Sequence, residues 1–144
     1  MPISMTNDMM RAIIMDHSSN PNNKHNPPKD GYEKVHMHSA NCIDDIDIFI
    51  LMEDNIVKDA CFEGIACTIS LSSIDILCDL IKGKSKKDVL YMIDQYHHML
   101  HEEPFVEEVL EEAVVFINTS KQAARIRCAS IGWNGAEEIL KEEK

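Results

Sequence analysis

The stretch DIDIFILMEDNIVKDACFE, residues 45–63, decides the fold. Its first half alternates apolar and more polar side chains with a period of two, which predicts a strand over 45–53 with one buried face. Asp54 and Asn55 tolerate positive φ and predict a tight turn, after which residues 56–63 return as an antiparallel strand. The residues expected on the buried face of the first strand are Ile46, Ile48, Ile50 and Met52.

One more strand is predicted before this hairpin, over residues 32–38, and helices are predicted around it. Ser85 with Asp88 resembles a capping box at the start of one helix. Gly132 and Gly135 each cost about 1 kcal/mol relative to alanine and predict interruptions in the last helix. The expected helices span 4–16, 68–82, 86–101, 105–117 and 121–142.

Length and composition are those of one globular domain over residues 1–144. Strands followed by helices predict an α+β fold, in which a small three-stranded antiparallel sheet has helices packed over one face and at the C-terminus. Residues 18–31 are rich in Asn and Pro and are expected to form a flexible loop.

The chain is acidic, with 25 Asp and Glu against 14 Lys and Arg and a formal net charge of -11. Nucleic acids and anionic membranes bind basic surfaces, so this charge argues against both as main partners. No apolar run reaches the roughly 18 residues of a membrane span, and the N-terminal residues do not form a secretory signal pattern. We therefore expect a cytoplasmic protein.

Five cysteines, an odd count, do not fit a closed disulfide framework. Cys61 falls within a strand and Cys78 on an apolar helix stripe, so both are expected to be core residues. His36 and His38 share one strand face, where a solvated edge is expected and a two-histidine metal site is the alternative.

The other three cysteines and one aspartate, Cys42, Asp44, Cys67 and Cys128, lie at the edges of predicted elements. Cys42 and Asp44 lie in the turn between the first two strands, and Cys67 begins a helix, where free N–H groups favour a thiolate. Three thiolates and a carboxylate suit tetrahedral zinc or an iron–sulfur cluster, and the carboxylate is the more exchangeable ligand. From spacing alone, ordinary buried cysteines remain an alternative.

Several motifs, in the same order along the chain, resemble those of SufU-type proteins. These are a branch of the IscU-like, NifU N-terminal-like iron–sulfur cluster assembly scaffolds. The resemblance runs from residue 10 to residue 140. The matching segments are Met15-Asp16-His17 with Asn20-Pro21-Asn22-Asn23-Lys24, Cys42-Ile43-Asp44, FEGIACTIS over 62–70, Lys82-Gly83-Lys84, ARIRCAS over 124–130, and Trp133.

Three features resemble the SufU branch more than the IscU branch. Arg127 stands where IscU-type proteins have a histidine, directly before the last cysteine, and the chaperone-recognition motif LPPVK is absent. The long gap before Cys128 has room for the additional segment of SufU-type proteins, which includes residues 102–117. The positions that depart from the family's glycines are His25, Ile43 and Ala66.

The resemblance implies a zinc ion held by Cys42, Asp44, Cys67 and Cys128. It also implies that Cys42 is the catalytic residue of a sulfurtransferase, accepting sulfur from a SufS-type, PLP-dependent cysteine desulfurase, with Arg127 supplying positive charge. The sulfur would pass to downstream cluster assembly or apo-acceptor proteins. One alternative is a scaffold on which a transient iron–sulfur cluster is assembled and passed to apo-proteins. A second alternative is a zinc-stabilised interaction module without sulfur chemistry.

Overall fold

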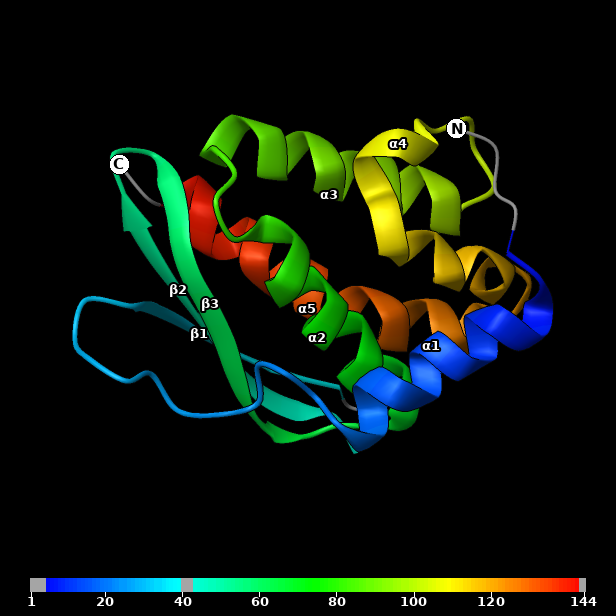
Figure 1. Ribbon diagram of the computed structural model, residues 1–144, viewed down its shortest axis with the longest axis horizontal. Coiled ribbons are helices and arrows are strands. Elements are labelled where there is room, and N and C mark those ends of the chain that lie inside the picture. The colour runs from blue at the N-terminus through cyan, green and yellow to red at the C-terminus, as the bar shows by residue number, and fades with distance from the viewer. Residues whose placement is uncertain (1–4, 40–42, 143–144) are drawn as a thin grey trace.

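The computed structural model describes residues 5–39 and 43–142 and confirms the α+β architecture. Figure 1 shows the sheet along one side of the helices, with α2 and α5 crossing the middle of the molecule. No helix in the described ranges is both long and apolar enough to span a membrane. The elements are α1 (Asn7–Ser19), β1 (Glu33–His38), β2 (Asp45–Glu53), β3 (Ile56–Ile65), α2 (Thr68–Ile81), α3 (Lys86–Leu100), α4 (Glu107–Leu110), η1 (Glu111–Lys121), which is a 3₁₀ helix, and α5 (Ala123–Glu142).

The sheet has the strand order β1-β2-β3, and both neighbouring pairs are antiparallel. Asp54 and Asn55 take φ values of 54° and 62°, so the predicted turn of the hairpin is confirmed. β3 continues two residues beyond its predicted end, to Ile65. The inner face of β2 is formed by Ile46, Ile48 and Ile50, which are at most 1% exposed, and by the partly buried Met52.

Two glycines let α5 pack closely on its neighbours. A Cβ added at Gly132 would lie 2.9 Å from Cβ of Ile74 in α2, and one added at Gly135 would lie 2.5 Å from Cδ1 of Ile48 in β2. α5 runs unbroken from Ala123 to Glu142, so the predicted interruptions at these glycines are wrong. Their missing side chains instead provide room for the α2–α5 and sheet–α5 contacts.

The predicted loop over 18–31 starts later than expected, because α1 continues to Ser19. Past that point the segment is hydrogen-bonded to β3: the Phe62 N–H donates to the carbonyl of Asn23 at 3.0 Å, and the His25 N–H donates to the carbonyl of Phe62 at 2.9 Å.

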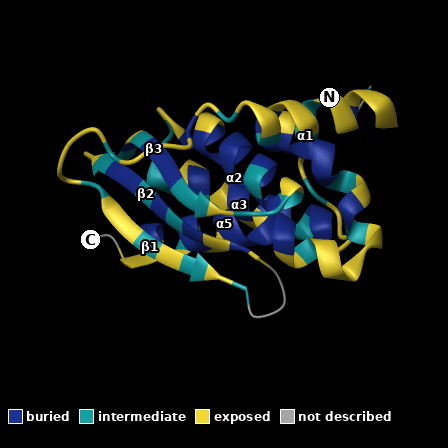
Figure 2. Cartoon of the chain, turned by 90° about the horizontal axis from the view of Figure 1, so that it is seen from below, coloured by how far each residue is buried: buried dark blue, intermediate teal, exposed yellow. Residues whose placement is uncertain are grey.

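Figure 2 shows β1 largely exposed at the edge of the sheet, beside the buried inner helices.

The predicted single helix over 105–117 is wrong. The chain forms the short α4. Glu111, the first residue of η1, then takes a φ of 47°, which ends the α-helical path and leads into the tighter turns of η1. Apolar side chains of both pieces nevertheless face the core, including Leu110 and Phe116, which are fully buried. The predicted apolar face therefore exists on a different backbone.

Candidate metal centre

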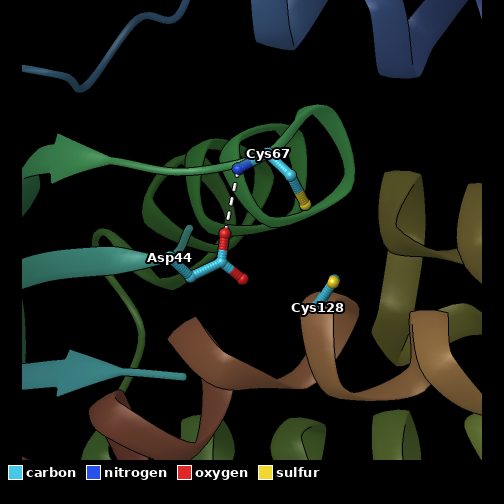
Figure 3. A group of neighbouring side chains, drawn as sticks. All are labelled: Asp44, Cys67 and Cys128. Atoms are coloured by element: carbon cyan, nitrogen blue, oxygen red, sulfur yellow. Dashed lines mark hydrogen bonds between the residues drawn. The ribbon is translucent and has the colours of Figure 1, made fainter. Parts of the chain in front are cut away.

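Asp44, Cys67 and Cys128 come together in the fold, and each contributes one ligand atom within 4.8 Å of the others. Figure 3 shows the Asp44 carboxylate and the two sulfur atoms directed toward one shared space. Asp44 lies just before β2, Cys67 just before α2, and Cys128 in the N-terminal half of α5. Asp44 is 2% exposed and Cys128 is 7% exposed, so these two donors are largely shielded from water, whereas Cys67 is partly exposed.

Two further residues, Cys42 and Arg127, were predicted to belong to the site. Cys42 lies outside the described residues, so its place in the site stays a prediction. Arg127 is exposed on α5, directly before Cys128 in the sequence. Its predicted contribution of positive charge to the site also stays a prediction.

The backbone at the start of α2 fixes the distance between Cys67 and Asp44. Cys67 is the N-cap residue of α2, and its Sγ accepts a hydrogen bond from the Ser70 N–H at 3.5 Å. The Cys67 N–H donates to Asp44 Oδ1 at 2.9 Å (Figure 3). The Ser39 N–H donates to the Asp44 carbonyl at 3.0 Å, which closes the base of the β1–β2 connection. One candidate ligand is thus hydrogen-bonded to the backbone of another.

Gly64 brings the end of β3 against the start of β2. Its φ is +124°, a conformation that L side chains rarely adopt, and a Cβ there would lie 2.3 Å from the carbonyl oxygen of Asp45. Asp44 and Cys67 flank this contact in the sequence. The close approach of the two strands therefore helps to set the separation of the two ligands.

Cys128 is held in place through the residue that follows it. The Ala129 carbonyl accepts hydrogen bonds from the Ser73 hydroxyl at 2.6 Å and from the Tyr96 hydroxyl at 2.8 Å. Tyr96 stacks on Trp133 with ring centroids 3.6 Å apart. These buried contacts fix α5 against both α2 and α3, and they fix the position of Cys128 with it.

The donor set fits zinc. Zn–S bonds of about 2.3 Å and Zn–O bonds of about 2.0–2.2 Å place the ligand atoms of a tetrahedral site roughly 3.5–3.8 Å apart. Separations within 4.8 Å need only small side-chain adjustments to reach that range. Two thiolates and a carboxylate supply three ligands and leave room for a fourth.

One position where the family has glycine does not require it here. Ala66 is not among the described residues with positive φ. Ile43 is 63% exposed, so its side chain points away from the buried carboxylate of Asp44 beside it. These departures are compatible with the arrangement of the described ligands.

Cys61 and Cys78 are core residues, as predicted, with exposures of 0% and 1%. Burial, with a smaller effect of the nearby Asp59 carboxylate, raises the pKa of the Cys61 thiol to about 11. Burial also raises the pKa of the Cys78 thiol well above its usual value. Both stay protonated near neutral pH and are poor nucleophiles.

His36 and His38 lie on the outer, exposed face of β1. His36 is within 2.8 Å of an Asp45 oxygen and within 2.7 Å of an Asp47 oxygen on the neighbouring strand. The predicted solvated edge is confirmed, and there the His36 ring contacts two carboxylates of the neighbouring strand.

Sequence reasoning missed a buried polar network around His17. Its Nδ1 lies 2.6 Å from Asp75 Oδ2, and its Nε2 lies 2.5 Å from Glu112 Oε1. Burial alone would lower the pKa of His17, but hydrogen bonds and charge from Asp75 and Glu112 outweigh it and raise the pKa. Asp79 lies close enough to complete a metal-ligand geometry with His17 and Asp75. However, the Asn23 amide donates to both aspartates, so this cluster is a hydrogen-bonded clamp between α1 and α2.

The second omission is Ser70, whose hydroxyl donates to Asp44 Oδ2. Ser70 and His17 both fall inside the motifs that carried the family resemblance, but neither shows its role through periodicity. A polar residue on a helix predicts a solvated position by default, and only the packing of α2 reveals that these groups are buried.

Comparison with known proteins places this geometry in a family. The family described as NifU-like N terminal domain matches residues 9–129. The iron-sulfur cluster assembly scaffold protein IscU of Streptococcus pyogenes serotype M1 is 31% identical over 142 residues, covering 98% of this chain and 88% of that protein. The zinc-dependent sulfurtransferase SufU of Bacillus subtilis (strain 168) is 34% identical over 137 residues, covering 94% and 92%.

A solved structure agrees with these relatives. The crystal structure of a putative iron-sulfur cluster assembly scaffold protein for the SUF system from Fervidobacterium islandicum AW-1 matches with a TM-score of 0.85. It is 25% identical and covers 89% of this chain and 93% of that one. The chain therefore belongs to the NifU-like N-terminal domain family of IscU/SufU iron–sulfur cluster assembly scaffolds.

Proposed function

We propose that the chain is a zinc-dependent sulfur acceptor. It takes sulfur from a SufS-type, PLP-dependent cysteine desulfurase and passes it into iron–sulfur cluster assembly. The observation that carries the proposal is the convergence of Asp44, Cys67 and Cys128 from three separate elements. The 34% identity to the zinc-dependent sulfurtransferase SufU supports it.

In this proposal Cys42 is the fourth ligand and the sulfur acceptor. Two residues of extended chain span about 7 Å at most, so covalent geometry keeps Cys42 near Asp44. Zinc, when bound, would keep the thiolates deprotonated and ordered without adding redox chemistry. Arg127 would add a positive charge beside Cys128 for an approaching thiolate.

The transfer of sulfur between the two proteins needs no oxidant. The Cys42 thiolate attacks the outer sulfur of a persulfide on the desulfurase. The sulfur–sulfur bond of the donor breaks, the donor cysteine leaves as a thiolate, and a new sulfur–sulfur bond forms on Cys42. The hydrogen bond from the Cys67 N–H to Asp44 Oδ1 involves no atom of the reacting Cys42 side chain.

A second candidate function is a scaffold for a transient iron–sulfur cluster. The relative from S. pyogenes, named as such a scaffold, aligns with 98% of this chain. The same donors suit a cluster as cargo, since a carboxylate ligand releases more readily than a thiolate.

Metal and sulfur analysis of protein purified anaerobically tests the proposal. We expect about one zinc per chain, as four ligands define one tetrahedral site. After incubation with the desulfurase and cysteine, Cys42 should carry one added sulfur atom by mass spectrometry. The Cys42→Ala variant should accept none, while Cys61→Ala, altered only in the core, should behave as wild type.

Three results would contradict the proposal. The first is full stimulation of the desulfurase by Cys42→Ala. The second is bound iron with acid-labile sulfide that transfers to an acceptor protein, which would favour the scaffold. The third is a folded, zinc-loaded protein that never accepts sulfur, which would favour an interaction module.

A further inference from the structure

Ser70 connects two of the candidate metal ligands. It lies in the first turn of α2 and has no exposed surface. Its hydroxyl donates to Asp44 Oδ2, and its Oγ lies 3.3 Å from Cys67 Sγ. Its backbone N–H also donates to Cys67 Sγ, at 3.5 Å. A single buried side chain thus contacts both the carboxylate and the thiol.

The hydroxyl of Ser70 can serve only one of these acceptors at a time. A serine hydroxyl has one hydrogen, which rotates about the Cβ–Oγ bond to suit its surroundings. In the structure this hydrogen is directed to Asp44, and the Cys67 sulfur is the second acceptor within reach. Hydrogen bonding of the hydroxyl to Asp44 therefore competes with hydrogen bonding to Cys67.

Asp44 depends on α2 for both of its oxygens. Oδ1 accepts from the Cys67 N–H at 2.9 Å, and Oδ2 accepts from the Ser70 hydroxyl. The residue is 2% exposed, so water cannot easily replace either donor. A buried carboxylate that lost the Ser70 hydroxyl would keep an unsatisfied oxygen, which is unfavourable.

We propose that Ser70 is a positioning residue that controls the exchange of Asp44 at the metal centre. The inference rests on the proposed zinc-binding function. The hydroxyl holds Oδ2 of Asp44 while that oxygen is not a metal ligand. When Oδ2 is engaged elsewhere, the hydroxyl turns to Cys67 Sγ and donates to the thiolate. Ser70 therefore orients the carboxylate in the first arrangement and donates to the thiolate in the second.

Ser72 supplies a matched control on the same helix. It is as fully buried as Ser70, but within the described part of the chain its hydroxyl donates only to carbonyls of its own helix, those of Thr68 and Ile69. Ser70→Ala and Ser72→Ala remove the same atom from neighbouring buried positions. Only the first removes a contact with the candidate ligands.

Zinc affinity, measured by competition with a chromophoric chelator, separates the two serines. Loss of a group that orients a metal ligand weakens binding roughly tenfold to a hundredfold, which is the effect expected for Ser70→Ala. Ser72→Ala should stay within about twofold of wild type. Cobalt substitution gives a second readout, because the thiolate-to-cobalt absorption band of Ser70→Ala should shift. Urea unfolding of both variants shows whether each remains folded.

A double-mutant cycle tests whether Ser70 acts through Asp44. In an Asp44→Ala background, adding Ser70→Ala should weaken zinc binding clearly less than it does in the wild-type background, because only the contact with Cys67 Sγ remains to be lost. An undiminished effect in that background, or a Ser70→Ala variant that binds zinc like Ser72→Ala, would overturn this inference alone. Wild-type protein that binds no zinc would overturn the proposed function and this inference with it.

Discussion

Replacing Gly64 with alanine should destabilise the protein and disturb the metal centre together. Gly64 has a φ of +124°, and an added Cβ would lie 2.3 Å from the carbonyl oxygen of Asp45 and 2.9 Å from Cα of Ile46. Both atoms belong to the backbone of β2, so no side-chain rotation can relieve the clash. Ordinary contacts begin at 3.4 Å, so the ends of β2 and β3 must separate by about 1 Å.

The expected loss of stability combines two effects. A non-glycine residue held in a sparsely populated φ/ψ region costs about 1–3 kcal/mol. Forcing an extra carbon into a packed site costs about 1–3 kcal/mol more. We therefore expect Gly64→Ala to lower the free energy of unfolding by about 4 kcal/mol, a large share of the 5–15 kcal/mol typical of a domain.

Gly83→Ala is the control that isolates backbone strain. Gly83 has a φ of +85°, but nothing lies within 4 Å of a Cβ placed there. It should lose only the strain contribution, about 1–3 kcal/mol. Urea denaturation of the metal-free variants, with unchanged m values, measures both losses.

Zinc affinity then tests the link to the site. Movement of about 1 Å where β3 leads into Cys67 should lengthen the 2.9 Å hydrogen bond from the Cys67 N–H to Asp44. Gly64→Ala should therefore bind zinc more weakly in the folded state, while Gly83→Ala should bind it normally. The reasoning is refuted if the two variants are equally stable, or if Gly64→Ala binds zinc as tightly as wild type.

Three further predictions concern the interior. The pKa of His17 is higher in the folded than in the unfolded chain, so protonated His17 stabilises the fold. This stabilisation is fully present below pH 6.5 and is lost as the pH rises through the pKa of His17 in the folded chain. The difference in unfolding free energy between wild type and His17→Gln should therefore shrink with rising pH in urea titrations; a constant difference would exclude this coupling. Iodoacetamide should modify Cys67 in the folded, metal-free protein but spare the buried Cys61 and Cys78, as mapped by mass spectrometry; native labelling of Cys78 would contradict its burial. The Trp133 indole N–H donates to the Ser73 hydroxyl at 3.0 Å, and Ser73→Ala removes this acceptor. The substitution should lower the free energy of unfolding by about 1–3 kcal/mol, measured by urea unfolding with the fluorescence of the single tryptophan.

The hairpin could be predicted from the sequence because its signals are local. Alternation over β2 specifies which side chains face the core, and Asp54 and Asn55 accept the positive φ that the turn needs. The helix starts at Thr68 and Lys86 also follow from neighbouring residues, and the Ser85 side chain caps α3 as expected. Each of these features depends on residues a few positions apart.

For α2, the periodicity of apolar residues predicts only part of the burial. Its apolar stripe was predicted, but the helix is buried nearly all round, including polar side chains at Ser70, Ser73 and Asp75. α1, the sheet and α5 enclose it, so polar positions that periodicity assigns to solvent become internal hydrogen-bonding sites. The Ser70 and His17 contacts could not be predicted because they depend on that enclosure.

The candidate site likewise combines contacts that follow from neighbouring elements with one that depends on the packing of α5. Asp44 and Cys67 could be expected to meet, since one directly precedes β2 and the other follows β3, the neighbour of β2 in the sheet. Cys128 arrives only because α5 lies close against α2, with Gly132 facing Ile74. A helical glycine costs about 1 kcal/mol by intrinsic propensity, which is why it predicted an interruption. In the folded chain that local cost is offset by a contact that no larger residue permits. The residue that weakens the isolated helix is therefore the one that lets α5 carry the third ligand to the other two.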